Sequence, residues 1–434
     1  MLENCVLTKR TNIKYNDNIK RFVYILTNLL MRRIDMAGGP GVYVFGQEEA
    51  KELAEVIDGK YLFRYGLMED KNFKKKVFTF EEEFKRKMGA DYCVATSSGT
   101  GSLMCCLSAI GIVPGDEVIV PGYTFIASIS SIILMNAIPV LAEIDESLTI
   151  DPEDVKKKIT DKTKAIMVVH MLGNQCNMDE IMKIAKEYNL YVIEDCCQAC
   201  GASYHGKRLG TIGDVGAFSL NFFKTISSGD GGAVITNDYD KYERAFGFHD
   251  QGHKPNRTGV EVGNRSIVGM NMRMNELTGA VALAQVRKLD DILTTLRTKK
   301  AKLKAMISGL EGFTFRKIND EQNECATLLT LIFDTKELAD KFCAEVKSKT
   351  ICHSGWHVYN NMEQILSFDG GKRYHKNMLA QTDDILERAV NISVGVVDGG
   401  LGSAFGININ STDEEIEAVG KRIIEVVSRI TDRG

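Results

Sequence analysis

The chain has 434 residues, of which 44% are hydrophobic, 26% are charged and only 6 are proline. This length predicts two or three compact units, and this composition excludes a mainly disordered or collagen-like protein. The 54 basic and 58 acidic residues give a net charge of −4, so binding to the phosphates of a nucleic acid is not expected.

The 11 cysteines are an odd number, and most of them sit inside apolar runs. This pattern favours free thiols in a reducing compartment, and therefore a cytoplasmic location. The apolar stretches are shorter than the roughly 18 to 20 residues of a membrane helix, so no membrane partner is expected. Residues 1–43 are predicted to be an N-terminal extension, of which the part before Met36 is dispensable. The short apolar run within it lacks the cleavage pattern of a secretory signal.

From residue 90 on, apolar runs of strand length alternate with amphipathic runs of helix length, as in repeated β-α-β units. The strand candidates are mostly continuous rather than alternating in polarity, as strands buried on both faces should be. We therefore predict an α/β fold with a mostly parallel central sheet and helices on both faces. The predicted strands are residues 92–95, 117–120, 139–144, 165–170, 190–194, 215–220 and 233–236, and the helices are 102–110, 126–135, 151–159 and 178–188.

The last third of the chain has a different pattern. One long helix is predicted from Met274 to Ile292, and basic helical sequence continues from Arg297 to Leu310 as a connection between domains. Strands at 328–333 and 391–394 and helices at 337–347 and after Thr412 follow. We therefore predict a large domain over residues 44–292 and a smaller C-terminal α+β domain over 293–434.

A glycine-containing turn, Gly99-Thr100-Gly101, follows a predicted strand and opens a helix, with Ser98 just before it. Free amide donors at a helix start suit a phosphate. The dinucleotide fingerprint would need a third glycine where Met104 stands, so one phosphate fits better than a pyrophosphate. Taken alone, the motif is more typical of an ordinary turn than of a phosphate site.

Two other patterns carry no function in our interpretation. Gly201 to Lys207 has P-loop spacing, but Arg208 replaces the Ser or Thr that would bind magnesium. Cys197 and Cys200 have the spacing of metal ligands, yet no second cysteine pair lies nearby to complete a tetrahedral set. No metal is therefore expected.

Two residues stand where chemistry is expected. Asp195, after Glu194, ends a predicted strand, and the carboxyl edge of a parallel sheet is where open α/β folds bind ligands. Lys224 lies among apolar residues before the turn Gly229 to Gly232, a setting that suits Schiff-base chemistry. A helix-capping aspartate and a surface lysine are the structural alternatives for each residue alone.

Together these motifs resemble the DegT/DnrJ family of sugar aminotransferases, which use pyridoxal 5'-phosphate (PLP) and have the type I fold of PLP-dependent transferases. The resemblance runs from about Val44 to Gln285, with weaker similarity to the end. It is carried by Ser98-Gly-Thr100, Pro114 to Pro121, Tyr123-Thr-Phe125, Glu194-Asp195 with Gln198-Ala199, Leu209 to Asp214, Phe218-Ser219 with Lys224, Gly229 to Gly232 and Met274-Asn-Glu276.

The resemblance implies the catalytic centre. Lys224 would hold the cofactor as a Schiff base and move the proton during transfer. Asp195 would keep the pyridine nitrogen protonated, because a nearby carboxylate favours the charged form. Gln198 would bond to the ring hydroxyl oxygen, and Phe125, or alternatively Tyr123, would stack on the ring.

The resemblance also implies how the phosphate and a partner chain are used. Gly99 and Thr100, through backbone amides, and Ser219, through its hydroxyl, would hold the phosphate. Relatives form homodimers with shared active sites, and Asn271 and Arg273 match the residues that complete the cofactor pocket of the partner chain.

The implied reaction moves an amino group from glutamate or glutamine to a keto or aldehyde sugar. Four segments, 63–65, 224–226, 250–253 and 269–273, resemble the branch that aminates an eight-carbon ulosonic acid; a nucleotide-linked keto sugar is the open alternative. In the related sugar dehydratases a histidine replaces the Schiff-base lysine, so Lys224 opposes that activity. A DNA-binding regulator would need a basic stripe, which the net charge opposes.

The substrate end departs from the family. The common pattern Tyr-x-Pro-x-His is replaced by Trp356-His357-Val-Tyr359. We expect an anionic substrate bound by Arg64, whose guanidinium offers two parallel donors, together with Trp356 and His357. An ion pair of Arg64 with Glu69 or Asp70 is the structural alternative.

Overall fold

The computed structural model describes residues 37–255 and 262–431, so the expected segment before Met36 lies outside the described residues. Its largest sheet has seven strands in the order β1-β9-β8-β5-β4-β2-β3. The pairs from β8 through β5, β4 and β2 to β3 are parallel, which confirms the predicted mostly parallel sheet. The strands are β1 (Tyr92–Thr96), β2 (Glu117–Pro121), β3 (Ile138–Ala142), β4 (Thr163–Val169), β5 (Tyr191–Asp195), β8 (Val215–Ser219) and β9 (Gly232–Thr236).

Strand β9 is the exception, because it runs antiparallel to both β1 and β8. It follows β8 after the connection 220–231, which contains no helix. A parallel return usually crosses over through a helix, and this connection of 12 residues has none. Strand β9 therefore runs back beside β8 as its antiparallel neighbour. Lys224 lies in this connection, between two paired strands.

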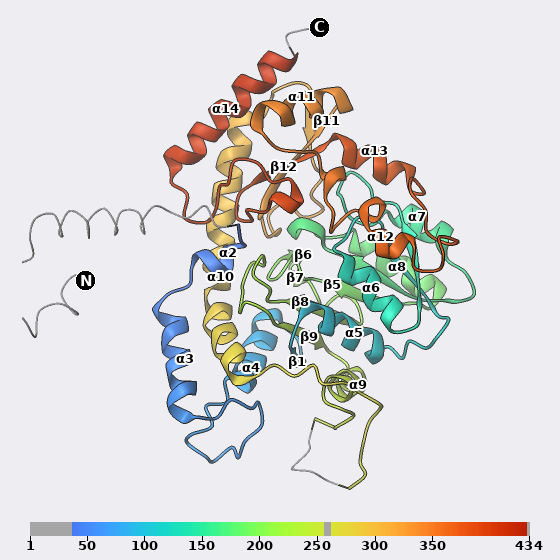
Figure 1. Ribbon diagram of the computed structural model, residues 1–434, viewed down its shortest axis with the longest axis vertical. Helices are drawn as coiled ribbons and strands as arrows, with labels where there is room; N and C mark the ends of the chain where they lie inside the picture. Colours follow the sequence, from blue (N-terminus) through green and yellow to red (C-terminus); the bar gives the residue numbers. More distant parts are fainter. Residues whose placement is uncertain (1–36, 256–261, 432–434) are drawn as a thin grey trace, which may run out of the picture. The chain divides into compact units, whose positions relative to one another are not determined.

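Helices cover both faces of the large sheet (Figure 1). In β2, Val118 and Val120 pack into one hydrophobic core and Ile119 packs into the other, as the alternation of a strand requires. The first core contains α5 (Gly99–Ala109), α6 (Ile126–Leu134) and α9 (Tyr239–His249); the second contains α4 (Lys76–Met88), α7 (Pro152–Lys158), α8 (Met178–Tyr188) and part of α10 (Glu276–Ile307).

The last third of the chain contains a second, smaller sheet. Its three strands are antiparallel in the order β10-β11-β12 and form a separate core with α11 and α14. The two expected strands are present, whereas β10 and α13 had not been predicted. The elements are β10 (Phe313–Phe315), β11 (Leu328–Phe333), α11 (Lys336–Val346), α12 (Glu363–Leu366), α13 (Ala380–Arg388), β12 (Ala389–Ser393) and α14 (Asp413–Thr431).

Helix α10 joins the two sheets (Figure 1). It is one helix of 32 residues, where the sequence predicted two helical stretches. Leu283 and Val286 lie in the core with α4, whereas Leu303 and Ile307 lie in the core of the small sheet. The expected domain boundary at residues 292/293 falls inside this helix, and the division stays a prediction.

The predicted extension over residues 1–43 is too long, because residues 37–43 belong to the folded unit. Gly38 exchanges two backbone hydrogen bonds of 2.9 Å with Val397, and the Gly39 N–H donates to the Phe222 carbonyl at 3.1 Å. A Cβ on Gly39 would lie 2.3 Å from the carbonyl carbon of Phe223. Only a glycine permits this approach, so the segment before α2 (Pro40–Tyr43) rests directly on the connection that carries Lys224.

Among the described residues, no helix is long and apolar enough to cross a membrane.

Candidate active site

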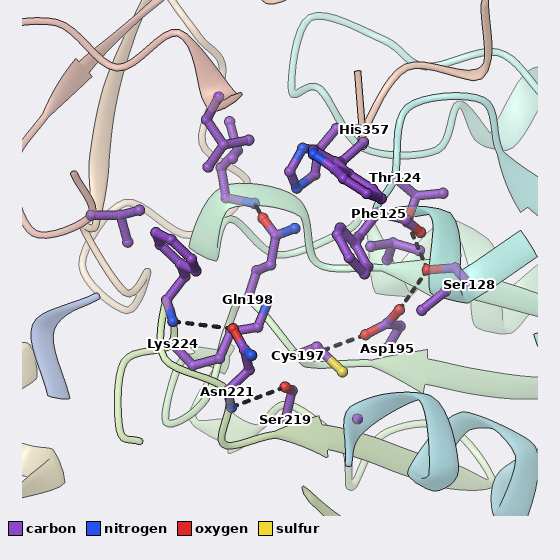
Figure 2. Close-up of a pocket in the computed structure, with 18 of the residues that line it drawn as sticks. Thr124, Phe125, Ser128, Asp195, Cys197, Gln198, Ser219, Asn221, Lys224 and His357 are labelled. Atoms are coloured by element: carbon purple, nitrogen blue, oxygen red, sulfur yellow. Dashed lines mark hydrogen bonds between the residues drawn. The ribbon is translucent and has the colours of Figure 1, made fainter. Parts of the chain in front are cut away.

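A cavity of about 550 Å³ (Figure 2) opens at the carboxyl ends of β4, β5 and β8. Residues that follow β12 also line it. This is the edge at which open α/β sheets bind ligands. Most of the site residues predicted from the sequence line this one cavity, namely Gly99, Thr100, Phe125, Asp195, Gln198, Ser219, Lys224, Trp356 and His357.

The first turn of α5 forms one end of the cavity. Ser98 caps the helix by accepting a hydrogen bond from the Gly101 N–H at 3.0 Å, and the amides of Gly99 and Thr100 have no partner within the helix. A Cβ on Gly99 would lie 2.6 Å from that of Ser219, so only glycine lets the end of β8 approach. The amide donors and the Ser219 hydroxyl therefore meet at one point, as an anion requires.

Asp195 ends β5, and its side chain is almost fully buried. Its Oδ1 accepts a hydrogen bond from the Cys197 N–H at 3.0 Å, and its Oδ2 accepts one from the Ser128 hydroxyl at 2.7 Å (Figure 2). Both donors are neutral. The carboxylate therefore lines the cavity without a cationic partner among the described residues.

The preceding residue, Glu194, is fully buried and has different partners. Its two oxygens accept from backbone N–H groups in the turn 210–213 at 2.6 to 2.8 Å. His170 Nε2 lies 3.1 Å away, and the Cys176 N–H donates to His170 Nδ1, which leaves the proton on Nε2 to reach Glu194. His170, Glu194 and Cys196 are close enough to hold a metal ion, but this carboxylate is already satisfied by protein donors.

Lys224 faces the aromatic side of the cavity, with Nζ 5.8 Å from the centre of the Phe125 ring. Phe125 precedes the first residue of α6 and is 37% exposed, whereas Tyr123, the alternative stacking residue, is fully buried and does not line the cavity. Gln198 Oε1 accepts from the Leu172 N–H at 3.0 Å. Its Nε2 group is therefore the donor that a ligand oxygen could use.

Trp356 and His357 line the cavity next to Phe125, on its aromatic side. The Trp356 ring stacks on Phe125 with centroids 6.4 Å apart, and the His357 ring lies 5.4 Å from it. His357 Nδ1 is 3.0 Å from the Ser354 hydroxyl. Burial, and then the charge of Lys224, lower the pKa of His357 to about 3, so this imidazole is neutral at neutral pH.

The expectation that Arg64 binds the substrate is corrected by the structure. Arg64 does not line the cavity, and its side chain is completely buried. It pairs with Glu81 at 2.8 Å and also donates to the Ala95 carbonyl and to His249 Nε2, at 3.2 and 2.9 Å. Neither Glu69 nor Asp70 is its partner. We call Arg64, Glu81, Ala95 and His249 the Arg64 cluster. An anion could pair with the guanidinium only by displacing the buried Glu81 carboxylate.

Asn271 and Arg273 also lie outside the cavity of their own chain. Arg273 Nη1 pairs with Asp250 at 2.6 Å, and its guanidinium lies 5.6 Å from the centre of the Phe63 ring. The Tyr65 hydroxyl donates to the other oxygen of Asp250 at 2.8 Å. Three of the four segments that resemble the ulosonic-acid branch thus meet at one place, apart from the cavity.

Several cavity residues had no assigned role in the sequence. Asp230 accepts a hydrogen bond from Asn221 Nδ2 at 3.0 Å, and Asp398 comes from the segment after β12. Thr124 and Ser128 differ from these, because both flank Phe125 at helical spacing and their hydroxyl oxygens lie 2.7 Å apart. That i, i+4 spacing is a signal the sequence contained.

Comparison with known proteins gives this site a context. Residues 46–397 match the DegT/DnrJ/EryC1/StrS aminotransferase family. The GDP-perosamine synthase of Escherichia coli O157:H7 is 42% identical over 50% of this chain and 59% of its own length. The L-glutamine:2-deoxy-scyllo-inosose aminotransferase of Streptoalloteichus tenebrarius is 40% identical over 52% of this chain and 54% of its own. The crystal structure of an aminotransferase from Psychrobacter cryohalolentis is 26% identical, with a TM-score of 0.75 over 89% of this chain and 98% of that one.

The chain therefore belongs to the DegT/DnrJ/EryC1/StrS aminotransferase family, and its fold is the predicted type I fold. The alignments span somewhat more than half the length of those two curated relatives.

Proposed function

We propose that the protein is a PLP-dependent aminotransferase that transfers the amino group of glutamate or glutamine to the keto or aldehyde group of a sugar. The observation that carries this proposal is that a single cavity brings together Lys224, Asp195 and the amide donors that begin α5. Family membership and the names of the relatives support the same activity.

The cavity fits PLP in its chemistry. Gly99, Thr100 and Ser219 offer neutral donors where the phosphate would lie, and Asp195 offers a carboxylate without a cationic partner for the protonated ring nitrogen. When bound, PLP would carry the amino group between donor and acceptor and withdraw electrons from the reacting carbon.

The residues of the chain would then divide the remaining work. Lys224 would hold PLP covalently and afterwards move a proton at the reacting carbon, because its Nζ is the one basic group among the described lining residues apart from the neutral His357. Phe125 and Trp356 would present apolar ring faces to the cofactor and the sugar and exclude water there.

For the acceptor we propose two classes, an oxidised eight-carbon ulosonic acid and a nucleotide-linked keto sugar. Both are anionic, yet the described lining residues include three aspartates, Asp195, Asp230 and Asp398, and no arginine. Lys224, the one cation of this described lining, would hold the cofactor, so an anionic acceptor would need a charge partner from outside it. The relative named GDP-perosamine synthase favours the nucleotide-linked class, whereas the similarity of segments 63–65, 250–253 and 269–273 favours the ulosonic acid.

We further propose that a homodimer supplies this partner, with Asn271 and Arg273 entering the cavity of the second copy. In support, the Arg273 guanidinium lies 5.6 Å from the centre of the Phe63 ring, and the chain close in sequence to these two residues carries apolar side chains that are about half exposed or more. These side chains are Phe63, Leu67, Met68 and Met270. Such a surface, which is costly to leave in water, is typical of an interface.

Subunit mixing tests this arrangement. Mixed Lys224→Ala and Arg273→Ala chains should regain activity, because a heterodimer would contain one intact site built from both chains. Random pairing would restore about a quarter of the sites. If Arg273 served its own chain, no activity would return.

The activity itself is tested with the purified protein loaded with PLP and ¹⁵N-labelled glutamate or glutamine. After the donor is washed away, a representative of each acceptor class is added separately. The expected result is ¹⁵N in the amino sugar formed from one acceptor class, with the cofactor absorbance returning to its starting state. Failure of both donors to change the cofactor absorbance would contradict an aminotransferase.

A further inference from the structure

A row of buried polar groups lies behind the cavity (Figure 2). The Thr124 hydroxyl oxygen is 2.7 Å from that of Ser128, and Ser128 Oγ is 2.7 Å from Asp195 Oδ2. Thr124 and Ser128 are completely buried, and Asp195 is 4% exposed. The direction of each hydrogen bond is therefore determined by the protons that these groups carry.

Counting those protons orients the row. A carboxylate only accepts hydrogen bonds, so the single hydroxyl proton of Ser128 is directed to Asp195. Ser128 Oγ must then accept, and Thr124 is its donor. Each hydroxyl in such a chain polarises the next one, which strengthens the last bond to the carboxylate.

The other contacts of Asp195 and of this turn complete the arrangement. The Cys197 N–H donates to Oδ1 while Ser128 donates to Oδ2, so one donor on each oxygen prevents rotation of the carboxylate. The turn itself is held by the neighbouring segment of the C-terminal part of the chain, because the amides of Thr124 and Ile126 donate to the carbonyls of His357 and Trp356 at 2.9 Å.

We propose that Ser128 is a positioning residue, which holds the Asp195 carboxylate in the orientation that receives the protonated ring nitrogen of PLP. This inference rests on the proposed function. Ser128 lies in the first turn of α6, and Phe125 is the residue just before that helix, so the same short segment would present the ring-stacking side chain and orient the carboxylate.

The test compares Ser128→Ala with Ser128→Thr, which keeps the hydroxyl, and with Ser131→Ala as a matched control. Ser131 is a buried serine of the same helix whose hydroxyl donates to the Ser128 carbonyl at 3.2 Å and does not contact Asp195. Each variant is loaded with PLP labelled with ¹⁵N in the ring. The readouts are the dissociation constant of PLP and the ¹⁵N chemical shift of the ring nitrogen, which reports its protonation.

We expect Ser128→Ala to bind PLP about tenfold more weakly, the scale of one hydrogen bond to a charged group, and to move the ¹⁵N shift toward that of an unprotonated ring. Ser128→Thr and Ser131→Ala should resemble the wild type. Thr124→Val removes the donor to Ser128 together with a longer contact of 3.4 Å to the Phe125 carbonyl, and it should move both readouts in the same direction by less. It takes the place of Ser128→Ala if that variant does not fold.

A double variant separates positioning from a general effect on the helix. In an Asp195→Asn background, Ser128→Ala should add less than a twofold loss of PLP affinity, because the hydroxyl has lost its charged target. Losses that multiply would overturn the inference, as would a Ser128→Ala protein with the wild-type dissociation constant and ¹⁵N shift. A wild-type protein that binds no PLP would instead overturn the proposed function.

Discussion

The Asp195 cavity and the Arg64 cluster both contain buried charged side chains, but they use their charge differently. In the Arg64 cluster the guanidinium is paired with Glu81 and two further acceptors, and no part of its side chain is exposed. Asp195 accepts only neutral donors and lines a cavity. A buried charge that is already compensated belongs to the fold, which loses stability when one partner is removed, whereas a charge that keeps an uncompensated side toward a cavity is available to a ligand.

Of the substitutions in the Asp195 cavity, replacement of Lys224 should have the largest effect on activity. Lys224→Ala should slow both half-reactions by at least about 10² to 10⁴-fold, the scale of a positioned acid or base. Borohydride followed by peptide mass analysis should find the cofactor on Lys224 in the wild type and no such label in the variant. Lys372→Ala, at an exposed lysine, is the control. Labelling of another lysine in the wild type would contradict the assignment.

Asp195→Asn keeps the size of the side chain and removes its charge. Amino transfer should fall by about 10²-fold or more, because the ring nitrogen loses the group that favours its protonation, while the fold survives. The measurement is single-turnover kinetics together with thermal unfolding. Near-native turnover of the Asp195→Asn variant would show that Asp195 has a structural role and no role in amino transfer.

In contrast to the two cavity substitutions, Arg64→Ala should lower stability and leave acceptor binding unchanged. Removing one partner of a buried ion pair leaves Glu81 uncompensated, and the free energy of unfolding should fall by about 3 to 5 kcal/mol. The KM for the keto acceptor should not change at a temperature where the variant is folded. Urea unfolding and steady-state kinetics measure the two quantities. If Arg64→Ala raised the KM for the acceptor without loss of stability, the result would support a role of Arg64 in binding the substrate.

The smallest effect concerns two of the buried histidines, one in each region. Burial lowers the pKa of His249 and of His357 to about 3, assisted by the charge of Arg64 for His249 and of Lys224 for His357. Below about pH 6.5 the unfolded chain therefore binds protons that the folded chain does not, so stability falls as pH decreases from 6.5 toward 3.

Each histidine should contribute up to about 1.4 kcal/mol per pH unit to this loss. His249→Gln and His357→Gln should each flatten the dependence, which urea unfolding at pH 7, 6 and 5 would measure. A variant with the full wild-type slope would show that its histidine is charged in the folded protein.

The sequence predicted the elements whose local composition decides their structure. The strands of the large sheet are buried on both faces and therefore appear as apolar runs, whereas β10 has three residues and is partly exposed, which leaves no pattern to detect. Asp195 could be found because strand ends in a parallel sheet share one edge, and Lys224 because a lysine among apolar residues before a glycine turn suits Schiff-base chemistry.

Arg64 could not be assigned in this way. Its partners Glu81 and His249 lie 17 and 185 residues away, and only the tertiary fold brings them together. Ser128 is an intermediate case, because its spacing from Thr124 is visible in the sequence but the face that meets Asp195 is set by packing.

Helix α10 has a consequence for how the protein unfolds. An α-helix of 32 residues is about 48 Å long, and here its first half is buried with α4 and its second half with the small sheet. Neither core can open without exposing apolar side chains of a helix that the other core holds. The described parts of both sheets should therefore melt in one cooperative transition, and hydrogen exchange along α10 should be uniformly slow rather than divided at its middle.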